Sequence, residues 1–251
     1  MRRRQRALGA VVVALVLFAG MAGASGGVTG GTGGFPSPRA DDTAPVIPAG
    51  ASVARAQAWL TKALSLRLEA LSAESIAAGV ARNLSAAHRT ALNTIIATDR
   101  SGLTRLSTGL ASETTIAELQ ATADAMVLDY RVFSLLVPQV SGVILADREL
   151  ADAVSLAALE PSMQTAITTE ERTGNRAAVA RRIYARLVAL LGAAEASTGA
   201  TATALLALTP ENGTPASTTL ATSSSALAAA GLQVVSAEVD VRRIVKILGG
   251  T

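Results

Sequence analysis

The chain has no cysteine, a single histidine and only 2% aromatic residues, and these shortages exclude several kinds of chemistry. Without cysteine, neither disulfide bonds nor thiol catalysis can contribute, although an exported protein could have used disulfides. The single histidine, His88, excludes metal sites built on paired histidines, and the Glu-x-x-His motif of di-iron bundles is absent. We therefore expect no bound metal and no cofactor. His88 falls in the first turn of a predicted helix, where we expect it to be solvated rather than catalytic.

Other catalytic equipment is equally scarce. The sequence contains no Gly-x-Ser-x-Gly motif and no glycine loop that could cradle a phosphate. Two carboxylate pairs, Glu149 with Asp152 and Glu170 with Glu171, could in principle do glycosidase-type chemistry. Each pair lies beside an arginine, however, which is typical of a solvated helix face. The sequence therefore predicts a protein that is not an enzyme.

The N-terminus has the three parts of an export signal. Four of the first six residues are arginine, an apolar segment follows at Leu8–Phe18, and Ala22-Gly23-Ala24 provides small residues for cleavage. The apolar segment is too short to span a membrane comfortably, and no cysteine follows it for lipid attachment. We predict a signal peptide over 1–24, cleavage near Ala24, and a secreted or cell-wall-associated protein without a transmembrane segment in the mature chain.

The charge of the whole chain is dominated by this leader. The complete sequence has 22 basic and 19 acidic residues and a pI near 9.9. Removing the four leader arginines leaves 18 basic and 19 acidic residues, a net charge of −1. No basic run with interleaved aromatic residues remains, so we exclude nucleic acid as a partner.

Composition divides the rest of the chain into two parts. Residues 25–50 are rich in glycine and proline and predict a disordered tether, because they cannot bury enough apolar surface to order themselves. Residues 51–251 are rich in alanine and leucine with helical periodicity. They predict one all-α domain, an elongated and mostly antiparallel bundle of about five or six helices with coiled-coil-like packing.

The bundle is expected to be organised on the stretch Ala125–Glu149, which carries no charge between Arg131 and Asp147. Met126, Tyr130, Phe133 and Val137 share one helical face. Polar residues interrupt the stretch too often for a membrane span, so we interpret it as a buried helix kinked near Pro138. A T-x-x-E capping box at Thr115 places the start of this helix near Ile116.

Local signals delimit the other helices. One is expected over 52–80 with Ser52 as its N-cap, and the next after Ser85. Trp59 of the first helix is expected in the core or at its edge, with stacking on a ligand as the alternative. In that second helix Asp99 occupies a seam position, where it either pairs with an arginine across the interface or lies at the rim. Further helices are expected over 176–208 and beyond the break at 209–215. The last one keeps a heptad of apolar residues at Leu220, Leu227, Val234, Val241 and Leu248.

The run Asp129-Tyr130-Arg131-Val132-Phe133, followed by Leu135-Leu136-Val137-Pro138-Gln139, resembles a segment of secreted, alanine-rich, all-helical proteins of actinobacteria. Weaker similarity extends over 85–248 and includes Leu208-Thr209-Pro210. That family has no known activity, so the resemblance implies a fold and a location only.

Two functions remain. The first is a non-catalytic structural or interaction protein of the cell envelope or extracellular space, whose partner is a cell-wall component or another envelope protein. The second is a carrier that holds lipid or another apolar ligand among its helices. Asp129, Tyr130, Arg131 and Pro138 are the candidate polar centre, although structural pairing of Asp129 and Arg131 is the simpler interpretation. A large interior cavity would favour the carrier, and a close-packed interior would favour the structural module.

Overall fold

The described part of the chain is built entirely from helices. The computed structural model describes residues 45–173 and 176–249. The α-helices are α2 (Val53–Val80), α3 (Ala86–Gly109), α4 (Ile116–Leu128), α5 (Val137–Ala157), α6 (Glu160–Thr173), α7 (Ala177–Leu206) and α8 (Gly213–Gly249). Short 3₁₀ turns, η1 (Leu110–Ser112) and η3 (Pro210–Asn212), join some of them, and η2 (Val132–Leu136) is a π-helical turn. The helices pack against one another, which confirms the predicted all-α bundle.

The first three helices begin where their capping residues predict. The Ser52 hydroxyl accepts from the backbone N–H of Arg55 at 3.3 Å, and Ser85 caps α3 in the same way. At α4 both halves of the capping box are present, between Thr115 and Glu118. These bonds satisfy backbone donors that a helix leaves free in its first turn.

The central helix differs from the prediction, because it is broken upstream of Pro138 rather than kinked at it. α4 ends at Leu128, and Arg131 adopts a left-handed conformation with φ of 40°. The π-turn follows, with an i→i+5 hydrogen bond from the backbone N–H of Leu136 to the carbonyl of Arg131 at 3.3 Å. Pro138 then lies in the first turn of α5, where its missing N–H costs no hydrogen bond. The break changes the helical phase.

The change of phase decides which side chains of this stretch reach the core. Met126 is buried as expected, but Tyr130, Phe133 and Val137 lie at the edge of the core. The fully buried positions after the break are instead Val132, Leu135 and Leu136, each at most 3% exposed. The periodicity therefore identified the right segment and, beyond Asp129, the wrong face.

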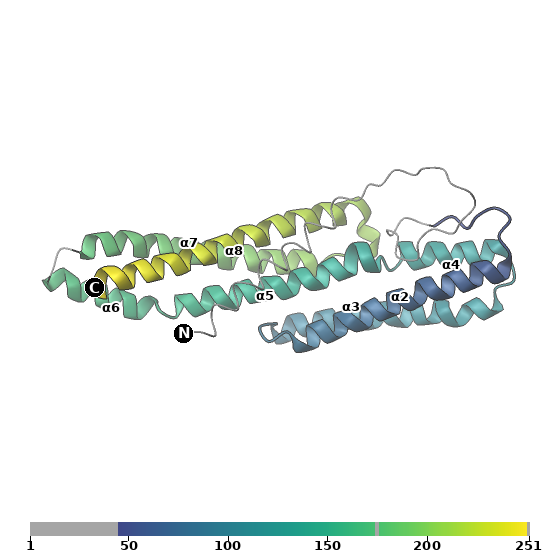
Figure 1. The fold of residues 1–251 in the computed structure, drawn as a ribbon, viewed down its shortest axis with the longest axis horizontal. Coiled ribbons are helices and arrows are strands. Elements are labelled where there is room, and N and C mark those ends of the chain that lie inside the picture. The colour runs from purple at the N-terminus through teal and green to yellow at the C-terminus, as the bar shows by residue number, and fades with distance from the viewer. Residues whose placement is uncertain (1–44, 174–175, 250–251) are drawn as a thin grey trace. The chain divides into compact units, whose positions relative to one another are not determined.

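The C-terminal half is a helical hairpin packed on α5. α6 starts at Glu160, so Pro161 begins a new helix rather than bending α5. α7 and α8 run antiparallel, and Figure 1 shows them side by side above α5. The predicted heptad of α8 faces inward: Leu227, Val234 and the intervening Ala230 and Ala237 are buried.

Two main groups of buried residues share α5. The first contains side chains from α2, α3, α4 and the start of α5, together with Leu205, Leu208 and Ala216. The second contains Ala153 of α5, Met163 of α6 and the inner faces of α7 and α8. α5 thus contributes its N-terminal part to one core and its C-terminal part to the other.

The chain contacts the first core before the predicted start of the helical domain. Ile47 is 6% exposed and belongs to the first core, and its backbone N–H donates to Gln120 Oε1 at 2.8 Å. The Gln120 side chain donates in turn to the carbonyl of Pro45 at 2.8 Å. Pro45 and Ile47 fall within the predicted tether over 25–50, and both are hydrogen-bonded to Gln120 of α4. The predicted signal peptide and the rest of the tether lie outside the described residues.

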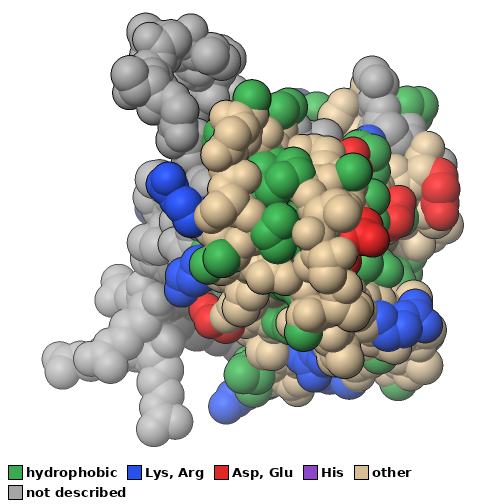
Figure 2. Space-filling model, turned by 90° about the vertical axis from the view of Figure 1, so that its right-hand side faces the viewer, with side chains coloured by type: hydrophobic (Ala, Val, Ile, Leu, Met, Phe, Trp, Pro, Cys, Tyr) green, Lys and Arg blue, Asp and Glu red, His purple; other side chains and the backbone are tan. Residues whose placement is uncertain are grey.

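Two helical stretches have the length and hydropathy of a membrane span, Ile116–Glu171 and Pro215–Leu248. Within the bundle, 44% of the apolar window is buried in the first and 28% in the second. On the face shown in Figure 2, hydrophobic side chains are interspersed with polar atoms, as is usual for protein surfaces.

Candidate functional site

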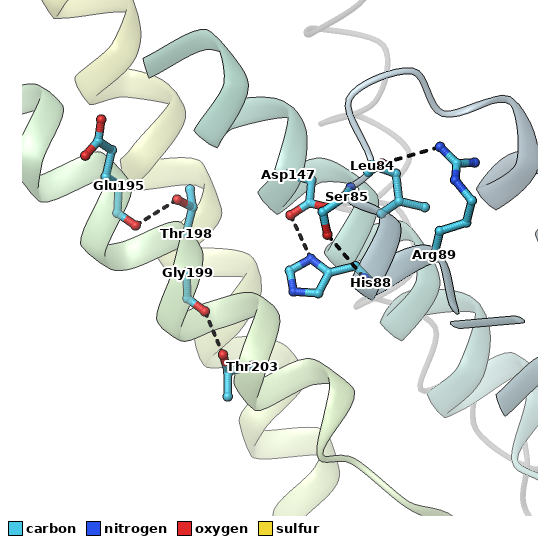
Figure 3. Close-up of polar contacts among 9 residues, drawn as sticks. All are labelled: Leu84, Ser85, His88, Arg89, Asp147, Glu195, Thr198, Gly199 and Thr203. Atoms are coloured by element: carbon cyan, nitrogen blue, oxygen red, sulfur yellow. Dashed lines mark hydrogen bonds and ion pairs between the residues drawn. The ribbon is translucent and has the colours of Figure 1, made fainter. Parts of the chain in front are cut away.

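A buried carboxylate, Asp147, joins the start of α3 to the middle of α5. Asp147 is 4% exposed, and its Oδ2 accepts from the backbone N–H of Ser85 at 2.7 Å. Its Oδ1 lies 2.8 Å from Nδ1 of His88, whose side chain is 26% exposed. Figure 3 shows the His88 ring directed at Asp147 while Ser85 caps the helix beneath it. A buried carboxylate is stabilised here because it meets the positive end of α3.

This arrangement corrects the expectation that His88 is solvated. Nδ1 of His88 lies within hydrogen-bonding distance of the Asp147 carboxylate, and Nε2 makes no hydrogen bond to another described residue. An aspartate that orients a histidine is two thirds of a catalytic triad. The nearby hydroxyl, Ser85 Oγ, accepts from the backbone N–H of His88 at 3.2 Å and is occupied as a helix cap. The pair therefore ties two helices together, and the hydroxyl nearest to it among the described residues serves as a helix cap.

The predicted polar centre does not form a single site. Asp129 is exposed at the C-terminal end of α4, and Arg131 occupies the left-handed position after it. The Arg131 Nε is buried without a hydrogen-bond partner. Pro138 is the first-turn proline of α5 and brings no polar group. These residues mark a break in the helix, because they end α4 and begin the π-turn.

Tyr130, the remaining member of that set, has a packing role. Its ring lies against Gly102 of α3, so closely that a Cβ at Gly102 would overlap it. On α2, the buried guanidinium of Arg67 lies over the ring of Phe133, 5.1 Å from its centroid. The two aromatic residues of the D-Y-R-V-F run thus pack the segment between α4 and α5 against α3 and α2.

Gln139 makes a second hydrogen-bonded link between helices, which the sequence did not predict. It is 1% exposed, and its Nε2 donates to the carbonyls of Leu205 at 2.7 Å and Leu208 at 3.3 Å. These carbonyls lie at the C-terminal end of α7, where a helix leaves acceptors free. One turn later Gly142 lies so close to Leu205 that an added Cβ would be 2.6 Å from its Cδ1. Helices α5 and α7 approach closely at this point.

A third tie joins α7 to α8. Asp240 is completely buried and accepts two hydrogen bonds of 2.7 Å from Arg186, one from Nε and one from Nη2. The Arg186 side chain is 57% exposed, so one partner remains in water. The sequence contains no local signal that Arg186 reaches a buried carboxylate 54 residues away.

The two members of the predicted pair Glu149 and Asp152 lie in different environments. Glu149 is 6% exposed, contrary to the expectation of a solvated face, whereas Asp152 is exposed and lies 4.0 Å from Arg148. Burial raises the pKa of both carboxyls, and the Arg148 guanidinium opposes the rise. Glu149 packs beside Gly231 of α8. Its burial therefore results from helix packing.

Burial also disfavours the charged form of two further carboxyls, one on α2 and one on α3. Burial raises the pKa of Asp99 to about 6 and that of Glu74 to about 7. Asp99 is only 9% exposed, and no ion pair or hydrogen bond joins it to another residue of the described chain. The alternative of an arginine partner for Asp99 is therefore wrong. Within the described residues, no group of three acids or histidines is arranged to hold a metal.

A shallow open depression of about 680 Å³ lies on the outer surface of α3. Its lining residues are all exposed and mostly carry hydroxyl or amide groups: Thr90, Asn93, Thr94, Ala97, Thr98, Ser101 and Arg105. A pocket for an apolar ligand is concave and largely apolar. This depression lies on one helix outside both cores and fits no such ligand.

Comparison with known proteins adds no further constraint: no protein-family model, curated protein or solved structure matches the chain. The resemblance to secreted actinobacterial proteins stays a prediction.

Proposed function

We propose that this chain is an exported, non-catalytic structural or interaction module of the cell envelope or extracellular space. The observation that carries the proposal is the close packing around the central helix. Gly102 and Gly142 admit Tyr130 and Leu205 into space where a methyl group would collide. An interior filled to this degree favours a rigid module over a carrier.

The buried polar groups support the same conclusion. Asp147, Gln139 and Asp240 each bond to a different helix from their own. Buried polar networks of this kind specify one arrangement of the helices at some cost in stability. An enzyme instead aims such groups into a cleft, with their pKa values matched to a reaction.

A native mass spectrum of the protein recovered from its own host's culture tests the proposal. We expect the mass of Ser25–Thr251 without additional ligand. Excess mass that is lost on denaturation would overturn the module and establish a carrier.

Export is tested separately by cell fractionation. The wild type should be found outside the membrane without residues 1–24. The variant Ala24→Leu should keep the leader, because it removes a small residue from the cleavage site. A wild-type protein that retains Met1 in the cytoplasm would refute the proposed location.

A further inference from the structure

The outward face of α8 carries large aliphatic side chains that no helix of the described bundle covers. Leu232 is 70% exposed, and Val235 and Val239 are each 44% exposed. They lie at i, i+3 and i+7 and so share one face of the helix. Single exposed aliphatic residues are common on protein surfaces, whereas a stripe of them on one helix indicates an interaction surface.

This stripe is the centre of a longer pattern, which we call the outer seam of α8. Its positions alternate by four and three residues over seven turns of helix: Ala221, Ser225, Ala228, Leu232, Val235, Val239, Arg242 and Lys246. All of them are exposed except Ala228, which is half-buried. The inner face of α8 has the same period and packs on helices. A 3.5-residue period keeps a seam facing another helix, so the outer seam fits a helical partner.

The order of side-chain sizes along the seam identifies that partner. The N-terminal part has small residues, at Ala221, Ser225 and Ala228, and the central and C-terminal part has large ones. A second copy of α8 can pack antiparallel about a two-fold axis between Leu232 and Val235. Each position of the outer seam in one copy then lies opposite a position of the outer seam in the other copy. Val239 then faces Ala228 of the second copy, and the long side chain of Arg242 faces Ser225. Large residues opposite small ones fill an interface evenly.

Charge selects the antiparallel orientation. The seam is uncharged until Arg242, which bonds to Glu238 on its own helix at 3.1 Å, and it ends at Lys246. Parallel pairing would place each lysine against its own copy, which is unfavourable. Antiparallel pairing separates the two basic ends by most of the helix length. The two-fold axis also makes the interface isologous, the commonest arrangement in soluble oligomers.

A lipid surface fits the seam less well. Interfacial helices carry lysine and arginine beside their apolar stripe, whereas residues 213–237 of α8 carry no charge.

We propose that the chain forms a homodimer in which the outer seams of two α8 helices pack antiparallel. The pairing does not depend on the role proposed above, because a carrier could dimerise in the same way. The mass of the complex by light scattering and sedimentation tests it. The wild type should dimerise with increasing concentration, and Leu232→Glu should weaken the dimer at least tenfold.

The control variant is Ile76→Glu, which places the same charge at another exposed aliphatic position, 66% exposed on α2. It should dimerise like the wild type. Circular dichroism should show unchanged helicity for both variants, because neither side chain belongs to a core. A wild type that stays monomeric, or a dimer insensitive to Leu232→Glu, would overturn the proposal. So would vesicle binding that Leu232→Glu abolishes in a monomeric protein.

Cross-linking tests the orientation without background, because the chain contains no cysteine. Protein with Ala228→Cys mixed with protein carrying Val239→Cys should form a disulfide-linked heterodimer upon oxidation. Neither variant should cross-link efficiently with itself. Efficient self-linking of Val239→Cys would show parallel pairing and refute the antiparallel seam.

Discussion

Removal of the arginine from the Arg186–Asp240 pair should destabilise the bundle more than its exposed position suggests. Asp240 is completely buried, and both of its hydrogen bonds to another side chain come from Arg186. Arg186→Met keeps the aliphatic stem of the side chain but leaves a buried carboxylate without its cation. Breaking a fully buried pair in this way costs about 3–5 kcal/mol. Because Arg186 is 57% exposed, solvent already weakens the pair, and we expect a loss of about 2 kcal/mol.

The double variant Arg186→Met/Asp240→Asn separates the cost of the stranded charge from the loss of the arginine itself. It should recover at least half of the loss, because a neutral amide is cheaper to bury than an unpaired carboxylate. Urea unfolding followed by circular dichroism measures the free energy of unfolding. Fluorescence of Trp59, the single tryptophan, which lies at the edge of the first core, gives a second probe. A single variant within 0.5 kcal/mol of wild type, or a double variant no more stable than the single one, would refute this account of the pair.

Four further variants, one of them a control, test the packing, the interhelical link through Gln139 and the buried Asp99. Gly102→Ala should cost about 1–3 kcal/mol in urea unfolding because its methyl group overlaps a tyrosine ring. Gly192→Ala, in open space within α7, should instead stabilise the protein by about 0.5–1 kcal/mol. If both alanine variants changed the free energy of unfolding in the same direction, the close contact between Gly102 and Tyr130 would be contradicted. Gln139→Leu should lose about 1–3 kcal/mol, since two carbonyls lose their donor, and a thermal melt like that of wild type would exclude the tie. The pKa of Asp99 is raised to about 6, so its folded form binds a proton more tightly than its unfolded form and stability falls as pH rises from about 4 to 6. Asp99→Asn should remove the part of that slope that Asp99 contributes and gain about 2 kcal/mol at pH 8, while Glu74, whose pKa is raised to about 7, keeps its own part. Unchanged pH dependence of unfolding would argue against a buried charge at Asp99.

Helix starts were predictable because their signals are local. Ser52, Ser85 and the Thr115 capping box each act within three residues, and the structure has all of them where the sequence places them. The inner heptad of α8 was predictable for a similar reason, since its period is a property of one segment.

The break in the central stretch was not predictable in the same way. Residues 129–137 are apolar enough to continue a helix, and the first strong helix breaker, Pro138, follows them. The structure ends α4 at Leu128 instead, with Arg131 in a left-handed conformation that its side chain does not favour. Tertiary packing of Tyr130 on Gly102 and of Phe133 under Arg67 accompanies that conformation. Such packing leaves no periodic trace in the sequence.

The polar ties were missed because their partners are distant in the chain. His88 and Asp147 are 59 residues apart, and Arg186 and Asp240 are 54 apart. A single sequence shows the charge of each residue but not which helix it faces. His88 and Glu149 were therefore expected in water, and the helices that bury them come from elsewhere in the chain.

The composition of the first core affects when that core can form during synthesis. It includes Leu205, Leu208 and Ala216, although most of its residues precede 144. While the chain emerges from its N-terminus, α2, α3 and α4 therefore lack part of their apolar cover until residue 216 is available. A core built from neighbouring helices alone could close earlier in synthesis than this one.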